Sequence, residues 1–447
     1  MDALTPPDPA IRALRAPWVW LRLVRAPRGR VWRRLAIRSP MDAHAGDPRV
    51  SPLWWIRRPA GPFYLLLGCT AILLTLGLVM VLSASSVTSV TTFGSAYAVA
   101  QKQVIWAAIG LPLGWVASRL PQRIYRRLAY PVLFATLLLL ALVQVPGLGR
   151  QVNGSTNWLV LGPVTFQPSE LAKLALVLWG ADLLARKHAH LAESRHVVVP
   201  LVPVGILLLG LVLLGGDLGT SIVLATILGA SLFVAGAPGR VFAAFGAIML
   251  AGVIAMIRLE PYRLARVTAL FSPGADPSGA GYQGLHGSYA LAGGGWWGVG
   301  LGASAEKWGF LPEAHTDFIF AVLGEELGLA GTLGVLGLFA LLTYAGFRVA
   351  MDSTDLFTRF AAAAATSWLT VQALVNIGAV IGLLPITGIP LPLISYGGSA
   401  LVLDLITLGM LVSFARSNLR AAAQTQESRS PHPHAQPSAR SREAPTT

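Results

Sequence analysis

The sequence has few charged residues and almost no cysteine. Only 12% of its 447 residues are charged, roughly half the share found in an average soluble domain. The single cysteine, Cys69, excludes an intrachain disulfide and a thiolate metal cluster. The eight histidines have no zinc-type spacing, and no phosphate-binding loop, dinucleotide-binding glycine pattern or HExxH sequence is present. Nucleotide-driven transport and metalloprotease chemistry are therefore excluded.

Apolar residues dominate the chain instead. They make up 54% of the sequence, and the mean hydropathy is +0.62. A protein core alone does not account for so much apolar sequence, whereas lipid does. We therefore expect an all-α, polytopic membrane protein, in which each crossing helix needs about 20 mostly apolar residues. Ten segments meet that test: 62–84, 103–119, 128–147, 167–185, 198–214, 218–237, 241–258, 317–347, 360–383 and 394–415.

The distribution of basic residues predicts the orientation in the membrane. The net charge of +14 and the pI near 10.7 would suggest a nucleic-acid partner for a soluble protein. Here the basic residues gather in both tails and in alternate short loops, so no nucleic acid is expected. The positive-inside rule then places both termini in the cytosol. The long, polar and glycine-rich loop 259–316 faces outward.

Three parts follow from this pattern. Residues 1–61 form a basic cytosolic tail with no signal-peptide core, and its arginines and tryptophans fit either contact with anionic lipid or disorder. Residues 62–417 form the ten-helix membrane domain. Residues 418–447, rich in Ser, Pro, Gln and Arg, are expected to be disordered.

Ionisable residues in or beside membrane segments are costly, so each is a functional candidate. Glu170 and Lys173 are three residues apart at the start of the fourth span, so they share a helix face and can pair. Asp317 opens the eighth span directly after the long outer loop. With the predicted topology these residues gather at the outer face. The other candidates there are Asp217, Arg263, Arg266, Lys307, His315, Glu325, Ser395, Gly397 and Gly398.

Each acidic candidate also has a purely structural interpretation. Glu170 and Asp317 stand at helix starts, where a carboxylate favours the helix dipole. Asp217 precedes Leu-Gly-Thr and fits a helix cap, and Glu325 fits a packing charge. Composition and topology leave three classes open: an enzyme acting on a lipid-linked substrate, a transporter, and a scaffold.

Six motifs in the same order resemble the SEDS family (shape, elongation, division and sporulation proteins). They are NGSTNWLVLGPVTFQPSELAK (153–173), GDLGTS (216–221), PYRLARV (261–267), DPSGAGYQ (276–283), LPEAHTDFIFAVLGEELG (311–328) and PLISYGGSA (392–400). Ala314 and the basic N-terminal extension resemble the division branch, the FtsW proteins of high-GC Gram-positive bacteria, more than the elongation branch. One departure is His286, where family members often carry Gln.

The resemblance implies a function for the membrane domain. Such proteins polymerise lipid II, the undecaprenyl-pyrophosphate-linked disaccharide pentapeptide, into β-1,4 glycan strands at the outer face of the cytoplasmic membrane. Their partners are a class B penicillin-binding transpeptidase and other divisome proteins at the septum. Because the sugar is α-linked in lipid II and β-linked in the product, a single inverting displacement is expected. A lipid II flippase and a divisome scaffold remain the alternatives.

The resemblance also implies roles for the candidate residues. By motif position Asp317 is the catalytic base, and Glu170 with Lys173 positions substrate in a central cavity. His315, Ser395, Gly397 and Gly398 are expected to bind substrate, and Asp217 and Glu325 to shape the cavity. By charge and side, Arg263, Arg266 and Lys307 are candidates for the pyrophosphate. A divalent cation, Mg²⁺ or Mn²⁺, could share that duty, but the sequence shows no dedicated set of ligands for it.

Overall fold

The computed structural model describes residues 58–429, apart from 153–154, 163, 189–193, 260, 272–278 and 280. The predictions made for residues 1–57 and 430–447 lie outside these described residues. The backbone of residues 261–271 is described, but the side chains of Arg263 and Arg266 are not.

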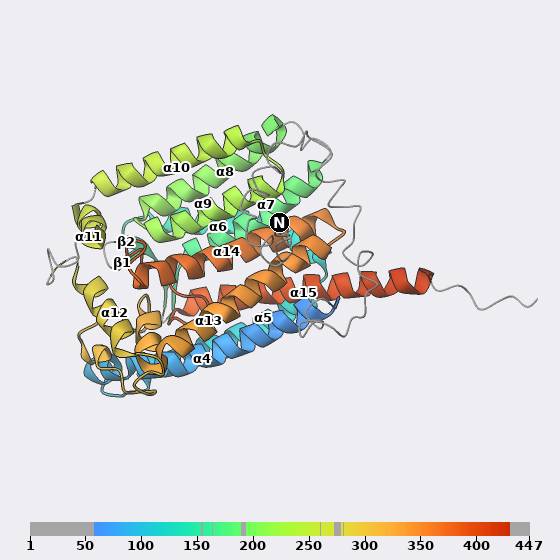
Figure 1. Cartoon of the computed structure of the whole chain (residues 1–447). Helices are drawn as coiled ribbons and strands as arrows, with labels where there is room; N and C mark the ends of the chain where they lie inside the picture. Colours follow the sequence, from blue (N-terminus) through green and yellow to red (C-terminus); the bar gives the residue numbers. More distant parts are fainter. Residues whose placement is uncertain are drawn as a thin grey trace, which may run out of the picture.

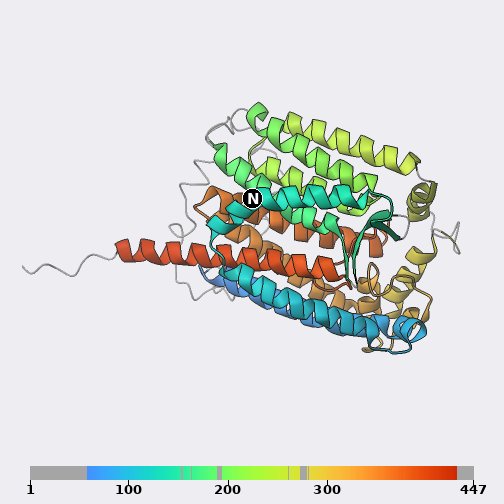
Figure 2. The same ribbon diagram turned by 180° about the vertical axis from the view of Figure 1, so that it is seen from behind.

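Long helices packed side by side make up most of the structure (Figures 1 and 2). In the described part of the chain, each of the ten predicted segments coincides with a helix. These helices are α4 (Gly61–Phe93), α5 (Ala98–Arg119), α6 (Gln122–Val143), α7 (Pro168–Arg186), α8 (Ser194–Leu214), α9 (Leu218–Val234), α10 (Gly239–Leu259), α13 (Ile319–Asp352), α14 (Leu356–Val380) and α15 (Gly398–Arg429). The predicted end of the membrane domain at residue 417 falls inside α15, which continues to Arg429.

Length and composition qualify five of the described helices as membrane spans: α4, α6, α13, α14 and residues Gly398–Gln424 of α15. Three shorter apolar stretches, Val199–Leu214, Leu218–Val234 and Gly239–Gly252, accompany them. The prediction of a helical, polytopic membrane protein is therefore confirmed. Helix α7 is a different case, because it carries several charged residues and is buried along nearly its whole length. A helix buried all round belongs to the interior of a bundle, so α7 is a central helix.

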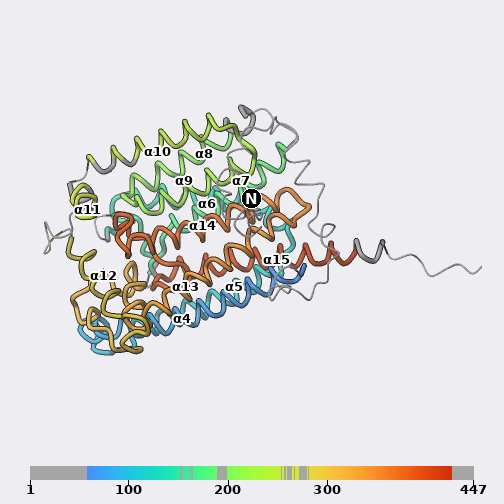
Figure 3. Tube along the Cα trace, viewed as in Figure 1, coloured from blue at the N-terminus to red at the C-terminus, as the bar shows by residue number. Residues whose placement is uncertain are grey.

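The predicted outer loop 259–316 contains further helical structure. It includes α11 (Pro261–Phe271), α12 (Tyr282–Gly293) and the short 3₁₀ helix η5 (Glu306–Trp308). Figure 3 shows α11 and α12 at one end of the bundle, opposite the end from which α15 projects.

A small sheet that the sequence did not predict lies between α6 and α7. Its strands β1 (Gly149–Val152), β2 (Ser155–Leu161) and β3 (Val164–Phe166) form an antiparallel meander in the order β1-β2-β3. The sheet is fastened to the α8–α9 turn, where Thr156 N donates to the Gly215 carbonyl (2.8 Å) and Ser155 Oγ donates to the Gly216 carbonyl (3.0 Å). The contact is close enough to require glycine, since a Cβ on Gly215 would lie 2.0 Å from the Asn157 side-chain amide.

The eighth predicted span is broken. Helix α13 has non-helical backbone at Gly328 (φ 68°, ψ −167°), which interrupts its hydrogen-bond ladder. The segment after α12 supplies the missing partners, because buried backbone groups need hydrogen bonds. Its bonds are Val299 N to Glu325 O (2.9 Å), Gly300 N to Glu326 O (3.1 Å), Leu329 N to Gly295 O (2.9 Å) and Ala330 N to Trp296 O (3.1 Å). Only glycine fits at the break, since a Cβ on Gly328 would lie 2.4 Å from the Gly298 amide nitrogen.

Candidate active site

Asp317 lies in the turn directly before α13, and this turn is joined to the segment between α14 and α15. Tyr396 N donates to the His315 carbonyl (2.9 Å), and Ser395 Oγ donates to the Thr316 carbonyl (2.6 Å). The motifs around residues 311–317 and 392–400, which are far apart in sequence, therefore meet in space. The Ser395 hydroxyl also accepts a hydrogen bond from the Leu391 amide (2.8 Å). One hydroxyl thus joins the turn at residues 391–395 to the turn before α13.

Asn376 of α14 completes this junction. Its Nδ2 donates to the backbone carbonyls of Asp317 (2.8 Å) and Ile389 (2.7 Å). The Asp317 carboxylate itself is half-buried and faces Gly388, where a Cβ would lie 3.5 Å from Oδ2. Gly388 has a φ of +73°, a conformation that side chains rarely adopt. The base expected from the motif is thus held by its backbone beside a glycine turn.

Gln103 of α5 holds the other end of the 389–397 segment. Its Nε2 donates to the Ser395 carbonyl (3.1 Å), and its Oε1 accepts from the Gly397 amide (3.3 Å). Gly398 begins α15 against Trp106, and a Cβ there would lie 2.3 Å from that indole ring. Gly398 therefore has a structural reason to be glycine, because a side chain there would meet Trp106. Gly397 contributes only its backbone amide, which any residue except proline would supply.

Glu170 and Lys173 form the ion pair that their spacing predicted. Lys173 Nζ lies 2.7 Å from Glu170 Oε2, and both side chains are almost fully buried. The ammonium also donates to Gln372 Oε1 (2.8 Å) and lies 5.0 Å from the Trp368 ring centroid. Gln372 in turn donates through Nε2 to the Pro390 carbonyl (3.1 Å). The pair is thereby connected to the segment that meets the Asp317 turn.

One face of α14 links the two parts of the site. Gln372 and Asn376 are four residues apart, so they lie one above the other on that helix. Gln372 connects Lys173 to Pro390, and Asn376 connects Asp317 to Ile389. Sequence reasoning missed both residues and Gln103. The available signal was an uncharged amide inside an apolar span, which needs a partner there.

Asp217 is a helix cap, as its structural interpretation predicted. It caps α9 by accepting from Thr220 N (2.8 Å) and Thr220 Oγ1 (2.7 Å). Asp217 Oδ2 also accepts hydrogen bonds from Gln167 Nε2 (3.1 Å) and Ser169 Oγ (3.3 Å), and these bonds fix the start of α7 beside it. Asp217 therefore orients the helix that carries Glu170.

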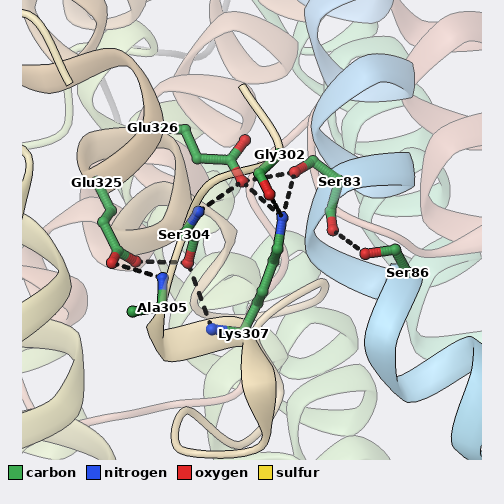
Figure 4. A network of polar contacts seen from close by, with 8 residues as sticks. All are labelled: Ser83, Ser86, Gly302, Ser304, Ala305, Lys307, Glu325 and Glu326. Atoms are coloured by element: carbon green, nitrogen blue, oxygen red, sulfur yellow. Dashed lines mark hydrogen bonds and ion pairs between the residues drawn. The ribbon is translucent and has the colours of Figure 1, made fainter. Parts of the chain in front are cut away.

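Lys307 and Glu325 are not part of this arrangement; they belong to a separate closed network (Figure 4). Lys307 Nζ donates to the Gly302 carbonyl (2.6 Å), Glu326 Oε1 (3.1 Å) and Ser83 Oγ (3.2 Å), and the side chain is 4% exposed. An ammonium has three donors, and all three are used here. This geometry leaves Lys307 no donor for a pyrophosphate, so we do not retain it as a pyrophosphate ligand.

Burial favours the uncharged forms of two aromatic side chains near Asp317. The rings of His315 and Tyr396 lie 5.6 Å apart. Burial lowers the pKa of His315, against a smaller opposing effect of Glu313, and burial raises the pKa of Tyr396.

His286 lies elsewhere, with Nδ1 2.6 Å from Glu306 Oε2, so it joins α12 to η5. In the described ranges, no three His, Cys, Asp or Glu side chains are grouped to hold a metal ion.

Comparison with known proteins settles the family. A family model described as "Cell cycle protein" and named for FtsW, RodA and SpoVE matches residues 64–420. The chain belongs to the SEDS family. It is 44% identical over 375 residues to the probable peptidoglycan glycosyltransferase FtsW of Mycobacterium tuberculosis, which covers 84% of this chain and 72% of that relative. It is 37% identical over 359 residues to the stage V sporulation protein E of Bacillus subtilis, covering 80% and 98% of the two chains.

Two similar solved structures agree with this assignment. One belongs to a peptidoglycan synthase complex described as coordinating polymerization and crosslinking, with a TM-score of 0.65, 32% identity and coverage of 79% of this chain and 98% of that one. The rod shape determining protein RodA of Thermus thermophilus gives a TM-score of 0.59 at 31% identity, covering 79% and 96%. The predicted family, its FtsW group and the enzyme class, a peptidoglycan glycosyltransferase, are therefore confirmed.

Proposed function

We propose that this chain polymerises lipid II into β-1,4 glycan strands at the outer face of the cytoplasmic membrane, for septal wall synthesis. In the proposal it works with a class B penicillin-binding transpeptidase and other divisome proteins. The observation that carries it is the convergence of Asp317 and the Glu170–Lys173 pair on one segment, residues 388–397. The Asp317 carboxylate, which can accept a proton, and the buried Lys173 ammonium therefore lie on either side of the same non-helical segment.

The proposed orientation has ten spans and both termini in the cytosol. In Figure 1 the start of α4 and the far end of α15 lie at the same end of the bundle, whereas α11, α12 and the sheet lie at the other. The first of these ends carries the basic residues Arg119, Arg123, Arg126, Arg127, Arg186 and Lys187. Basic residues mark the cytosolic side, which supports placing Asp317 outside.

The chemistry requires one inverting displacement. The 4-hydroxyl oxygen of the acceptor sugar attacks the anomeric carbon of the donor, whose bond to the pyrophosphate oxygen breaks. Asp317 takes the hydroxyl proton, and the undecaprenyl pyrophosphate leaves with the bonding electron pair. A well-placed general base typically contributes about 10²–10⁴ in rate. The bonds from Asn376 and Ser395 to the turn around Asp317 provide that placement.

Positive charge must balance the departing pyrophosphate. Arg263 and Arg266 on α11 remain our candidates by charge and by their place at the outer end of the bundle. Mg²⁺ or Mn²⁺ would supply the same charge, but the described side chains provide no ready set of ligands, so no step here depends on a metal. We assign Glu170 and Lys173 to positioning the substrate, with Gln372 holding the ammonium in place.

The test is lipid II polymerisation in liposomes by the purified chain together with its transpeptidase, comparing wild type with Asp317→Asn. Asp352→Asn serves as a matched control, because Asp352 is an exposed carboxylate at the opposite end of α13. We expect strands from wild type and from the control, and a rate lower by about 10²–10⁴ for Asp317→Asn. Full activity of Asp317→Asn would refute the base assignment. Failure of all three proteins to polymerise, with labelled lipid II still crossing the bilayer, would favour the flippase. Failure in both assays with the transpeptidase still bound would favour the scaffold.

A further inference from the structure

Lys307 stands at the centre of a buried polar network that connects three parts of the chain (Figure 4). Its ammonium joins Ser83 on α4 to Glu326 on α13, and Ser83 Oγ donates to the same Glu326 oxygen (2.5 Å). Beside it, Glu325 accepts from Ser304 Oγ (2.5 Å) and from the Ala305 amide (2.9 Å). Residues 302–307 are therefore held between α4 and α13 by these bonds. We call the bonds of Lys307, Glu325 and Glu326 the clamp.

Stability alone does not explain this choice of side chains. Burying a charge carries a desolvation penalty, and well-packed apolar residues of similar volume often replace a buried ion pair without loss. Glu326 even has one buried oxygen, Oε2, with no hydrogen-bond partner in the described part of the chain. What the charged groups add is directionality, since each bond specifies where one atom lies relative to another.

The break in α13 shows which element the clamp orients. Gly328 separates a short helical piece, residues 319–327, from the remainder of α13. Asp317 stands just before this piece, and Glu325 and Glu326 stand at its far end. Eight or nine residues of helix span about 12–14 Å. Because the piece is short and helical, a displacement at the glutamates is carried to the Asp317 turn.

The backbone of the same two glutamates is held as well. Their carbonyls accept the amides of Val299 and Gly300, so side chain and main chain bind one continuous segment. At the other end of the piece, Asn376 and Ser395 hold the Asp317 turn. The piece therefore has one set of bonds at each end, and the clamp is the set remote from the candidate catalytic residue.

We infer that Lys307 is a positioning residue: together with Glu326 it sets the location of residues 319–327 and thereby of Asp317. The inference rests on the proposed function, in which Asp317 is the base. It predicts a loss of turnover without a loss of lipid II binding, because the Glu170–Lys173 pair is held by other contacts. A misplacement of about 1 Å can lower a catalysed rate by about 10²-fold.

The variant to test is Lys307→Met/Glu326→Gln, which removes both charges of this ion pair. The matched control is Arg348→Met/Asp352→Asn, an ion pair at 3.3 Å on the same helix beyond the break. Polymerisation by the full complex with its transpeptidase gives kcat and KM for lipid II. We expect kcat to fall by about 10-fold to 10²-fold with KM within about two-fold of wild type. The control should keep both values.

A second readout does not depend on activity. Amide hydrogen exchange should become faster over residues 311–321 in the Lys307→Met/Glu326→Gln protein, and stay unchanged over α14 and in the control. Unchanged exchange over 311–321, or a wild-type kcat, would overturn the inference. If the wild-type protein does not polymerise lipid II at all, that result would instead count against the proposed function. The exchange experiment would still decide whether the clamp holds residues 311–321.

Discussion

Removing Glu170 alone should destabilise the protein far more than removing the whole ion pair. The Glu170→Gln protein keeps Lys173 in a site where it is 1% exposed and without its carboxylate. At the observed separation of 2.7 Å, the Coulomb attraction is about 6 kcal/mol at an effective dielectric constant of 20. Desolvation of the two ions, at several kcal/mol each, offsets most of it, so the pair adds little net stability.

The single variant loses the attraction but keeps the desolvation cost of the lysine. Removing one partner of a buried pair typically costs about 3–5 kcal/mol. The bond to Gln372 and the Trp368 ring remain, which places Glu170→Gln toward the lower end of that range. Glu170→Gln/Lys173→Met removes both charges of the pair. The buried Asp404, which interacts with both, then loses its attraction to Lys173 together with its repulsion from Glu170, so most of the loss should be recovered.

Thermal unfolding of the purified proteins in one detergent measures this difference. Arg186→Gln is the matched control: Arg186 pairs with Asp182 on the same helix, but its side chain is 58% exposed, and Arg126 also holds Asp182. Because Arg126 still pairs with the buried Asp182 in this control, no charge is left unpaired, and the control should unfold closer to wild type than Glu170→Gln does. A double variant no more stable than Glu170→Gln would refute the reasoning, because it would mean that the lost stability does not come from an unpaired lysine.

Two further predictions concern the segment around Asp317. Gly398→Ala should destabilise the protein by about 1–3 kcal/mol through overpacking against Trp106, and Trp106→Phe should partly restore the unfolding temperature; a Gly398→Ala protein as stable as wild type would contradict the close approach. Burial lowers the pKa of His315 below its usual 6.5, so the unfolded chain binds the proton more readily, and stability should fall as the pH drops below about 6.5 until the folded-state pKa is reached. Unfolding temperatures between pH 5 and 7.5 should therefore depend less on pH in His315→Gln than in wild type, and identical profiles would refute this.

Local sequence patterns were enough to predict the helices and one buried ion pair. Apolar runs of membrane length located the helices because lipid-facing and core-facing positions are both apolar. The contact between Glu170 and Lys173 followed from helical spacing alone, since both residues lie on one turn. Predictions of this kind depend on residues that are close in sequence.

Features that depend on distant segments were not predictable in this way. The break at Gly328 is possible because residues 295–300 supply replacement hydrogen bonds. No pattern within the apolar segment 317–347 indicates that residues 295–300 would bind there. Lys307 was expected to face the pyrophosphate because its charge was visible and its burial was not. Its true surroundings come from Ser83 and Glu326, which lie 224 and 19 residues away in the sequence.

The segment between α14 and α15 gives the strongest argument for the location that we propose for the chemistry. Backbone that leaves a helix inside protein needs other hydrogen-bond partners for its N–H and C=O groups. Here Leu393 has a positive φ of 65°, and the backbone is held by amide side chains from two helices. They are Gln103, Gln372 and Asn376. A continuous helix would have satisfied the same groups without them. This irregular backbone contacts the Asp317 turn and also Gln372, the partner of Lys173, and a straight helix could not reach both.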